Sequence, residues 1–402
     1  MRAHITAEPR NAASMNQSEL DQITTGDKVL LLLSQGHLSA ESESQICELL
    51  QKREIDWPAL IQESHEQQVF PLIYYNLRSL GFPSVPDASR RQLAASYVQN
   101  AARNMLLAQE LAAVLRILEE SGVPVIPLKG LPLAQSLYGD HALRVSDDMD
   151  ILVPRQFVTK ALQVLKQREY KGQLRHPGLE RLALRQGIEY CLTRKESQFE
   201  YVLELHWGIF LDLPSERAAL QDLWAKAIPK TVLSSQCFVL SVEWELLFLA
   251  VHAARHQWRG HKWMADIHEI ASRADVDWEQ LNRIALELGW DEILRISLVA
   301  CHKLYQTPLP STISSDHLPR WLRLVPFTQR SDGPAGVAFD LRLLKRPREK
   351  LTYLARVLLV PTGAEEAAVT LPEFLCFLYY PFRPIRLSWK WGRKILTGDT
   401  IL

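Results

Sequence analysis

Two aspartates, Asp148 and Asp150, are separated by one residue and stand directly before an apolar run at 151–153. The run predicts a strand. Side chains of a strand alternate between its two faces, so both carboxylates are expected on one face. Neighbouring carboxylates repel each other unless a cation lies between them. Mg²⁺ prefers carboxylate oxygens and leaves its other positions to water and phosphate. The pair therefore fits a metal-dependent phosphoryl or nucleotidyl transfer site.

The alternative for this pair is a solvated strand entry, since an Asp-x-Asp triplet is expected about once by chance in a chain of this length. The residues upstream favour a functional site. Lys129-Gly130 follows a β-branched run at 123–126 and precedes a helical stretch at 131–137. Glycine lets the backbone approach a ligand, and a helix N-terminus favours an anion. Lys129 adds a positive charge there, and Arg144 offers a forked guanidinium to a phosphate.

A second acidic position lies downstream. Two runs of alternating polarity, at 187–193 and 199–207, are separated by polar residues 194–198 and predict a β-hairpin. Glu204 and His206 fall on one face of the second strand, opposite its apolar residues. A charge inside an apolar strand is costly unless it is paired or binds a metal. On the strand alone, a metal site and an edge strand with a solvated glutamate are equally good interpretations.

These motifs together resemble the uncharacterised nucleotidyltransferase family of the polymerase-beta-like superfamily. The resemblance rests on Leu128-Lys-Gly-Leu131, Tyr138, Arg144, Asp148-Met-Asp-Ile-Leu-Val153 and Glu204-Leu-His-Trp207, and it extends to His252, His256 and the Lys262–Asp266 region. Lys129-Gly130 stands where the superfamily usually has Gly-Ser, so one phosphate-binding hydroxyl is absent. Glu204 stands where this family more often has aspartate, which shifts the carboxylate by one methylene.

The resemblance implies a nucleotidyltransferase that uses Mg²⁺, or Mn²⁺ in its place, to move NMP from an NTP to a hydroxyl acceptor with release of pyrophosphate. Asp148, Asp150 and Glu204 are the expected catalytic and metal-binding residues, with Glu204 as candidate base. Nucleotide contacts are expected from Lys129, Gly130, Arg144, His206 and Lys262. The acceptor is left open among small molecules, peptides, proteins and RNA ends. The alternative is a nucleotide-binding or scaffold protein of a biosynthetic assembly, without turnover.

The helical region after 242 holds the secondary candidates. His252 and His256 lie four residues apart and so share one helix face. The glutamate that follows the first histidine of a zincin is absent, because residue 253 is alanine. A substrate-lining or hydrogen-bonded core role is therefore favoured over zinc. Lys262 is expected to reach a triphosphate and Asp266 to pair with it or with a histidine; a structural ion pair between helices is an equal alternative.

The predicted fold class is α+β, a small mixed nucleotidyltransferase sheet with flanking helices between N-terminal and C-terminal helical regions. The long amphipathic stretch at 88–121 ends in Ser-Gly, a common helix stop, and leads into the first strand. The predicted units are a disordered tail (1–26), an N-terminal helical region (27–121), the nucleotidyltransferase core (122–241), a helical substrate-side unit (242–306) and a C-terminal helical cap (307–402).

Composition excludes several classes of protein. The 46 lysines and arginines balance 46 acidic residues, so no overall field attracts nucleic acid. The five cysteines show no Cys-x-x-Cys spacing and predict reduced thiols rather than disulfides or a zinc site. No apolar segment has the length of a signal peptide core or a transmembrane helix. A cytoplasmic protein is expected.

The C-terminal region mixes cations with leucines at 341–360 and with aromatic residues at 374–394. Such segments can lie on anionic membranes or stack on bases. The favoured interpretation is a helical cap with aromatic residues in its core and cations on a solvated face. A peripheral membrane or RNA contact is the less favoured alternative.

Overall fold

The computed structural model of the chain describes residues 24–52, 55–210, 214–314, 318 and 333–397. Most of the predicted tail, residues 1–23, lies outside these ranges. Its last residues belong to a helix instead, because Thr24 caps helix α2 (Thr25–Leu33) by accepting a hydrogen bond from the backbone N–H of Asp27. The carboxylate of Asp27 accepts from Thr24 in return, which completes a capping box and sets the helix start.

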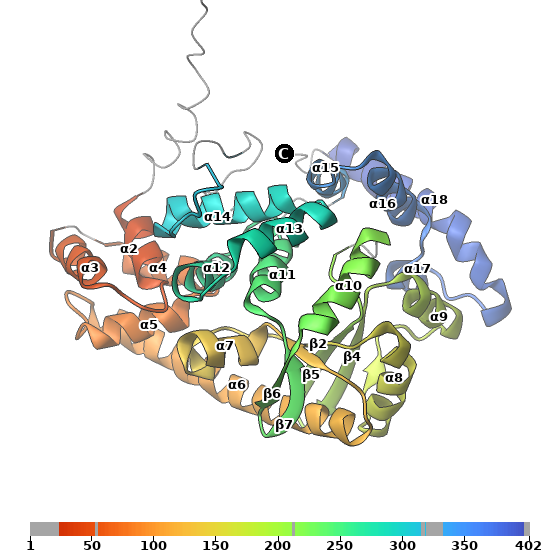
Figure 1. The fold of residues 1–402 in the computed structure, drawn as a ribbon, viewed down its shortest axis with the longest axis horizontal. Helices are drawn as coiled ribbons and strands as arrows, with labels where there is room; N and C mark the ends of the chain where they lie inside the picture. Colours follow the sequence, from red (N-terminus) through yellow and green to blue (C-terminus); the bar gives the residue numbers. More distant parts are fainter. Residues whose placement is uncertain (1–23, 53–54, 211–213, 315–317, 319–332, 398–402) are drawn as a thin grey trace, which may run out of the picture.

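Four N-terminal helices pack around one apolar cluster that includes Val29, Ile61 and Ile73. After α2 they are α3 (Ala40–Lys52), α4 (Trp57–Glu66) and α5 (Phe70–Ser79). The predicted long helix follows as α6 (Asp87–Glu120), which runs beneath the sheet in the view of Figure 1. Its C-terminal half buries Leu107, Leu111 and Leu115 against the strands.

A five-stranded mixed sheet forms the centre of the chain and confirms the predicted α+β class (Figure 1). Its order is β1-β2-β5-β4-β3, and β2 and β5 run parallel while the other neighbours are antiparallel. The strands are β1 (Ile126–Leu128), β2 (Met149–Leu152), β3 (Lys171–Gly172), β4 (Glu189–Glu196) and β5 (Phe199–His206). Strand β1 starts later than the β-branched run predicted, because the Val125 carbonyl accepts from Phe238 of a separate hairpin.

The two faces of the sheet have different partners. Met149, Leu203 and Leu205 belong to the apolar cluster shared with α6 and with α8 (Val158–Gln167). The residues next to them, Asp150 and Glu204, face the other way, toward the helices that follow the sheet. The alternation of side chains along a strand thus places the acids on the face opposite this cluster, where Leu152 joins a second apolar cluster.

Shorter elements connect and cover the strands. They are α7 (Gly130–Tyr138), η1 (His141–Leu143), η2 (Arg155–Phe157), α8 (Val158–Gln167), α9 (Pro177–Gln186), α10 (Pro214–Lys226) and the two-stranded hairpin β6 (Ile228–Val232) and β7 (Ser235–Val239). Beyond them lies a helical unit whose large apolar cluster also includes Ile126, Leu128 and Leu152 of the sheet. Its helices are α11 (Val242–Arg255), α12 (His261–Arg273), α13 (Trp278–Leu288) and α14 (Asp291–Tyr305). The predicted boundaries between units stay a prediction.

The C-terminal cap is helical, as expected, and consists of α15 (Pro334–Leu343), α16 (Pro347–Leu359), α17 (Gly363–Ala368), η3 (Glu373–Leu378) and α18 (Tyr379–Thr397). The expectation of core aromatics and solvated cations is wrong for several of its residues. Phe374, Phe377 and Trp389 are exposed, whereas Arg383 is buried in an ion pair with Glu365. None of the described helices combines the length and apolar composition that crossing a bilayer requires.

Candidate active site

The turn between β1 and α7 directs Lys129 to the acidic residues. Lys129 has a backbone φ of +32° and Gly130 a φ of +55°. A positive φ is uncommon for a residue with a side chain and is often found at functional sites. The Nζ atom of Lys129 lies 2.7 Å from Oδ2 of Asp150 and 3.6 Å from Oδ2 of Asp148. The lysine thus neutralises the aspartate pair, and its predicted contact with a triphosphate stays a prediction.

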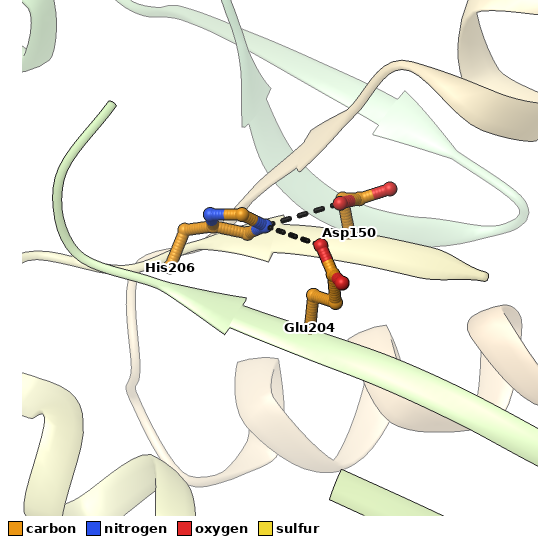
Figure 2. A group of neighbouring side chains, drawn as sticks. All are labelled: Asp150, Glu204 and His206. Atoms are coloured by element: carbon orange, nitrogen blue, oxygen red, sulfur yellow. Dashed lines mark hydrogen bonds and ion pairs between the residues drawn. The ribbon is translucent and has the colours of Figure 1, made fainter. Parts of the chain in front are cut away.

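The parallel pairing of β2 and β5 places Asp150 opposite Glu204. Asp148 precedes the first residue of β2 and lines the same cavity as Glu204. Figure 2 shows His206 between the two strand carboxylates, with Nε2 3.0 Å from Asp150 Oδ1 and 3.4 Å from Glu204 Oε2. The structure therefore brings the three predicted acids to one site, from two neighbouring strands.

A fourth carboxylate, Glu189, joins this group and was not singled out in the sequence. It lies opposite His206 in the β4–β5 ladder, with Oε2 3.3 Å from His206 Nδ1. Arg255 of α11 donates to both of its oxygens. The sequence could have indicated Glu189 through the register of the β4–β5 hairpin. A two-residue turn at Ser197 and Gln198 pairs Glu189 with His206, but the predicted turn, 194–198, was too wide to give this register.

Burial and nearby charges have opposing effects on the pKa values of several groups at this site. Burial alone would raise the pKa of Asp150, but the Lys129 ammonium and the His206 imidazole hold it well below its usual range. Burial and the Asp150 charge raise the pKa of Asp148. Burial disfavours the charged imidazole of His206, yet its hydrogen bonds to Asp150, Glu189 and Glu204 raise its pKa. Two cationic side chains therefore balance the acids.

Arg144 is turned away from the acid pair. Its Nε donates to Oδ2 of Asp266 at 2.9 Å, and its Nη2 is 2.8 Å from the same oxygen. The hydroxyl of Tyr138 donates to Oδ1 of Asp266 at 2.8 Å. Asp266 thus pairs with an arginine, not with Lys262 or a histidine as predicted. This buried pair ties the loop before β2 to α12, and a phosphate contact by Arg144 stays a prediction.

Buried amides of α6 hold the same loop from the other side. Asn104 donates to the carbonyls of His141 and Arg144 at 2.6 and 2.7 Å, and Asn100 donates to that of Ala142 at 2.8 Å. A buried amide that satisfies loop carbonyls fixes the path of the backbone. Helix α6 therefore helps to position Asp148, which the sequence pattern of apolar residues did not indicate.

Ser146 is a further residue that the sequence analysis missed. Its hydroxyl lies in the cavity wall and has no hydrogen-bond partner among the described residues. A Cβ built on Gly130 would be 3.8 Å from this oxygen, so the serine faces the start of α7. Ser146 thus places a hydroxyl near the turn at Lys129-Gly130.

A cavity of about 440 Å³ lies between the sheet, α11 and α12. Asp150 is not part of its lining, because its side chain is fully buried against Lys129 and His206, which do line the cavity. One wall is aromatic: Trp263 stacks on His256 with ring centroids 4.3 Å apart, and His252 lies 4.7 Å from His256. Lys262 donates to the Val145 carbonyl at 3.3 Å and lines the cavity; burial and the Arg144 charge lower its pKa to about 7. The sequence-predicted residues Lys129, Arg144, Asp148, Glu204, His206, His252, His256 and Lys262 all line this cavity.

The carboxylates fit a divalent cation. One ligand atom each from Asp150, Glu204 and His206 lie within 4.8 Å of one another, and Asp148 adds a nearby carboxylate. His206 would have to lose its proton to bind a metal, so the carboxylates are the better ligands. Hard carboxylate oxygens suit Mg²⁺ or Mn²⁺, and the cavity leaves room for water and phosphate. Within the described residues, no comparable cluster includes His252 or His256.

The site combines a small mixed sheet, with acids on two adjacent strands, and the start of a helix beside them. The family described as uncharacterised nucleotidyltransferase matches residues 53–306, more than half of the chain. The chain therefore belongs to this family, which confirms the predicted resemblance. No curated protein and no solved structure matches the chain.

Proposed function

We propose that this protein transfers NMP from an NTP to a hydroxyl acceptor in an Mg²⁺-dependent reaction. The observation that carries the proposal is the pairing of Asp150 with Glu204 across β2 and β5, next to a cavity that Asp148 and Glu204 line. Family membership supports the transferase class. Asp148, Asp150 and Glu204 would hold the metal, which supplies charge neutralisation at the triphosphate when bound.

Glu204 is proposed to accept the proton of the acceptor hydroxyl, because it combines a carboxylate in the cavity with a side chain still partly exposed to solvent. The hydroxyl oxygen then forms a bond to the α-phosphorus. The bond from that phosphorus to the bridging oxygen breaks in line, and pyrophosphate leaves with the electron pair. His206 and Arg255, through Glu189, hold the carboxylates in place.

The nucleotide is proposed to lie with its phosphates between the start of α7 and Lys262. Gly130 N–H, the Ser146 hydroxyl and the Lys262 ammonium supply donors there, and Lys129 supplies a positive charge. The stacked rings of His256 and Trp263 give a flat surface on the same cavity, which suits a nucleobase. Arg144 contributes by holding the loop through Asp266, and it also lines the cavity.

Pyrophosphate release from each of the four NTPs with Mg²⁺ tests the proposal. Asp150→Asn and Asp148→Asn should each lower turnover by roughly 10³-fold or more while the circular dichroism spectrum is kept, because charge stabilisation of a transition state is removed. Asp222→Asn on α10 is a matched control, since Asp222 lies outside the cavity lining and pairs with Lys226. Wild-type turnover in Asp150→Asn would disprove the proposed mechanism.

Isothermal titration of Mg-ATP and Mg-CTP separates the transferase from the alternative of a nucleotide-binding scaffold. Binding without pyrophosphate release, in the presence of cell extract as a source of acceptors, would favour the scaffold. Incubation of the extract with α-labelled NTP then shows which molecule acquires the label and so identifies the acceptor.

A further inference from the structure

Helix η3 and helix α18 carry an apolar stripe on their outer side. Phe374 is 77% exposed, Phe377 62%, Ile385 66% and Trp389 71%. With the exposed Pro381 between them, these residues follow one another at intervals of three or four, the spacing of a single helix face. One exposed apolar side chain is ordinary, but a continuous run of them marks a contact surface.

The opposite side of α18 is anchored to the protein. Tyr379, Arg383 and Leu387 are buried at intervals of four residues. Nη1 of Arg383 donates to Oε2 of Glu365 at 2.9 Å, and Nε of Arg386 donates to Oε1 of the same carboxylate at 2.5 Å. These ion pairs fix the rotation of the helix, so the stripe points outward. Figure 1 shows α18 at the outer edge of the molecule.

The charged residues of this segment are all positive. Residues 374–397 contain five lysines and arginines and no aspartate or glutamate. Glu365 neutralises Arg383 and Arg386, and Lys390 is exposed next to Trp389. The neighbouring helix α16 adds exposed apolar side chains, Leu351, Leu358 and Leu359. The cap therefore presents apolar and cationic groups together.

We propose that the C-terminal cap binds the surface of a lipid bilayer that contains anionic lipids, with α18 lying in the plane of the interface. Phenylalanine, isoleucine and tryptophan would enter the headgroup boundary, and lysine and arginine would contact lipid phosphates. This occupant fits better than single-stranded RNA, because Ile385 and Leu378 cannot stack on bases. It also fits better than a second copy of the chain, whose cations would repel those of the first.

The surface explains why the helical cap exposes Phe374, Phe377 and Trp389. It is separate from the cavity, since none of the residues of η3 or α18 lines that cavity within the described part of the chain. The inference therefore stands independently of the proposed nucleotidyl transfer, and its failure would leave that proposal untouched.

Flotation of the full-length protein with vesicles tests this surface. Phosphatidylcholine vesicles containing phosphatidylglycerol should carry the protein to the top of the gradient, and pure phosphatidylcholine vesicles should carry much less. The double variant Phe377→Ser/Trp389→Ser should lower the partition coefficient at least about tenfold, since two apolar side chains leave the interface. Lys390→Gln should lower binding about fivefold on the anionic vesicles and weaken its dependence on salt.

A matched control is Val98→Ser/Leu286→Ser, which removes two exposed apolar side chains from α6 and α13. It should bind vesicles like the wild type, and circular dichroism should show all variants folded. Three results would overturn the proposal: no binding to anionic vesicles, equal loss in the control variant, or a preference for single-stranded RNA. A dimer in light scattering that becomes a monomer in Phe377→Ser/Trp389→Ser would do so too, by assigning the stripe to a second copy.

Discussion

The Nζ atom of Lys129 lies 2.7 Å from Oδ2 of Asp150, and both groups are almost completely buried. The ammonium is therefore the counter-ion of a carboxylate that is also predicted to bind metal. Asp148 contacts the same ammonium at 3.6 Å. A divalent cation at these oxygens would compete with the lysine for the same negative charge. Metal binding and the Lys129 ion pair are thus thermodynamically linked.

Lys129→Ala should reveal this link. Without added metal, the variant should lose about 3 kcal/mol of unfolding free energy, because removal of one partner leaves a buried charge uncompensated. Mg²⁺ should then raise the melting temperature of the variant more than that of the wild type, since the cation replaces the lost ammonium. Thermal unfolding with Mg²⁺ and with EDTA measures both effects.

Lys226→Ala is the control for this experiment, because it removes the partner of Asp222 at a half-exposed pair. It should cost less than about 1 kcal/mol and show no additional response to Mg²⁺. Equal Mg²⁺ responses of Lys129→Ala and the wild type would show that metal and lysine do not share the aspartates.

The buried pair of Arg144 and Asp266 supports a second prediction. Asp266→Leu should destabilise the protein by roughly 3–5 kcal/mol, because the Arg144 guanidinium stays buried without its partner. Arg144→Met/Asp266→Leu should cost much less than the sum of the two single changes, since neither charge remains. Urea unfolding of the four proteins measures this double-mutant cycle.

The control cycle uses Glu292 and Arg295, a pair 2.7 Å apart on the surface of α14. Each single change there should cost less than about 1 kcal/mol. Additive effects of Arg144→Met and Asp266→Leu would contradict the role of this pair in holding the loop before β2.

The acidic pattern of the candidate site was predictable because it is local. Asp148 and Asp150 share a face through the period of one strand, and Glu204 and His206 through that of another. Glu189 and Arg255 were missed because their contacts depend on the register between strands and on the packing of α11. The orientation of Arg144 was missed for the same reason: Asp266 lies 122 residues away in the chain.

For the C-terminal helix α18, the sequence did not predict which side is buried. Its sequence is amphipathic, with aromatic residues and cations at helical spacing, and this pattern predicts a helix without stating which side is buried. The side is chosen by Glu365, whose pairs with Arg383 and Arg386 draw the cationic face inward. A tertiary ion pair thus reverses the usual expectation that apolar residues are inside.

Nucleotide affinity should depend on pH through Lys262. Burial and the charges of Arg144 and Lys129 lower its pKa to about 7, while Asp147 and Asp266 act in the opposite direction. The ammonium form attracts phosphate, so affinity for Mg-ATP should fall about tenfold between about pH 6 and about pH 8 as the lysine loses its proton. Titration calorimetry across this range measures the change.

Lys262→Arg is the matched variant for that series, because arginine keeps its charge at these pH values. The remaining slope in the variant reports the ionisation of the nucleotide itself. Parallel pH profiles of the wild type and Lys262→Arg would exclude Lys262 as a phosphate ligand.

Glu245, near the start of α11, predicts a pH dependence of stability that is separate from the cavity chemistry. Burial raises its pKa to about 7, against the nearby charge of Lys230. The folded state therefore binds this proton more tightly than the unfolded state does. Its contribution is present in full below the ordinary glutamate pKa and is lost as pH rises through about 7, by at most about 3 kcal/mol.

Glu245→Gln, which stays neutral, should flatten the profile of unfolding free energy between about pH 5 and about pH 8. Glu279→Gln makes the same change in the first turn of α13 at an exposed position, so it should keep the wild-type slope. Urea unfolding at a series of pH values measures all three proteins, and a wild-type slope in Glu245→Gln would show that another group is responsible.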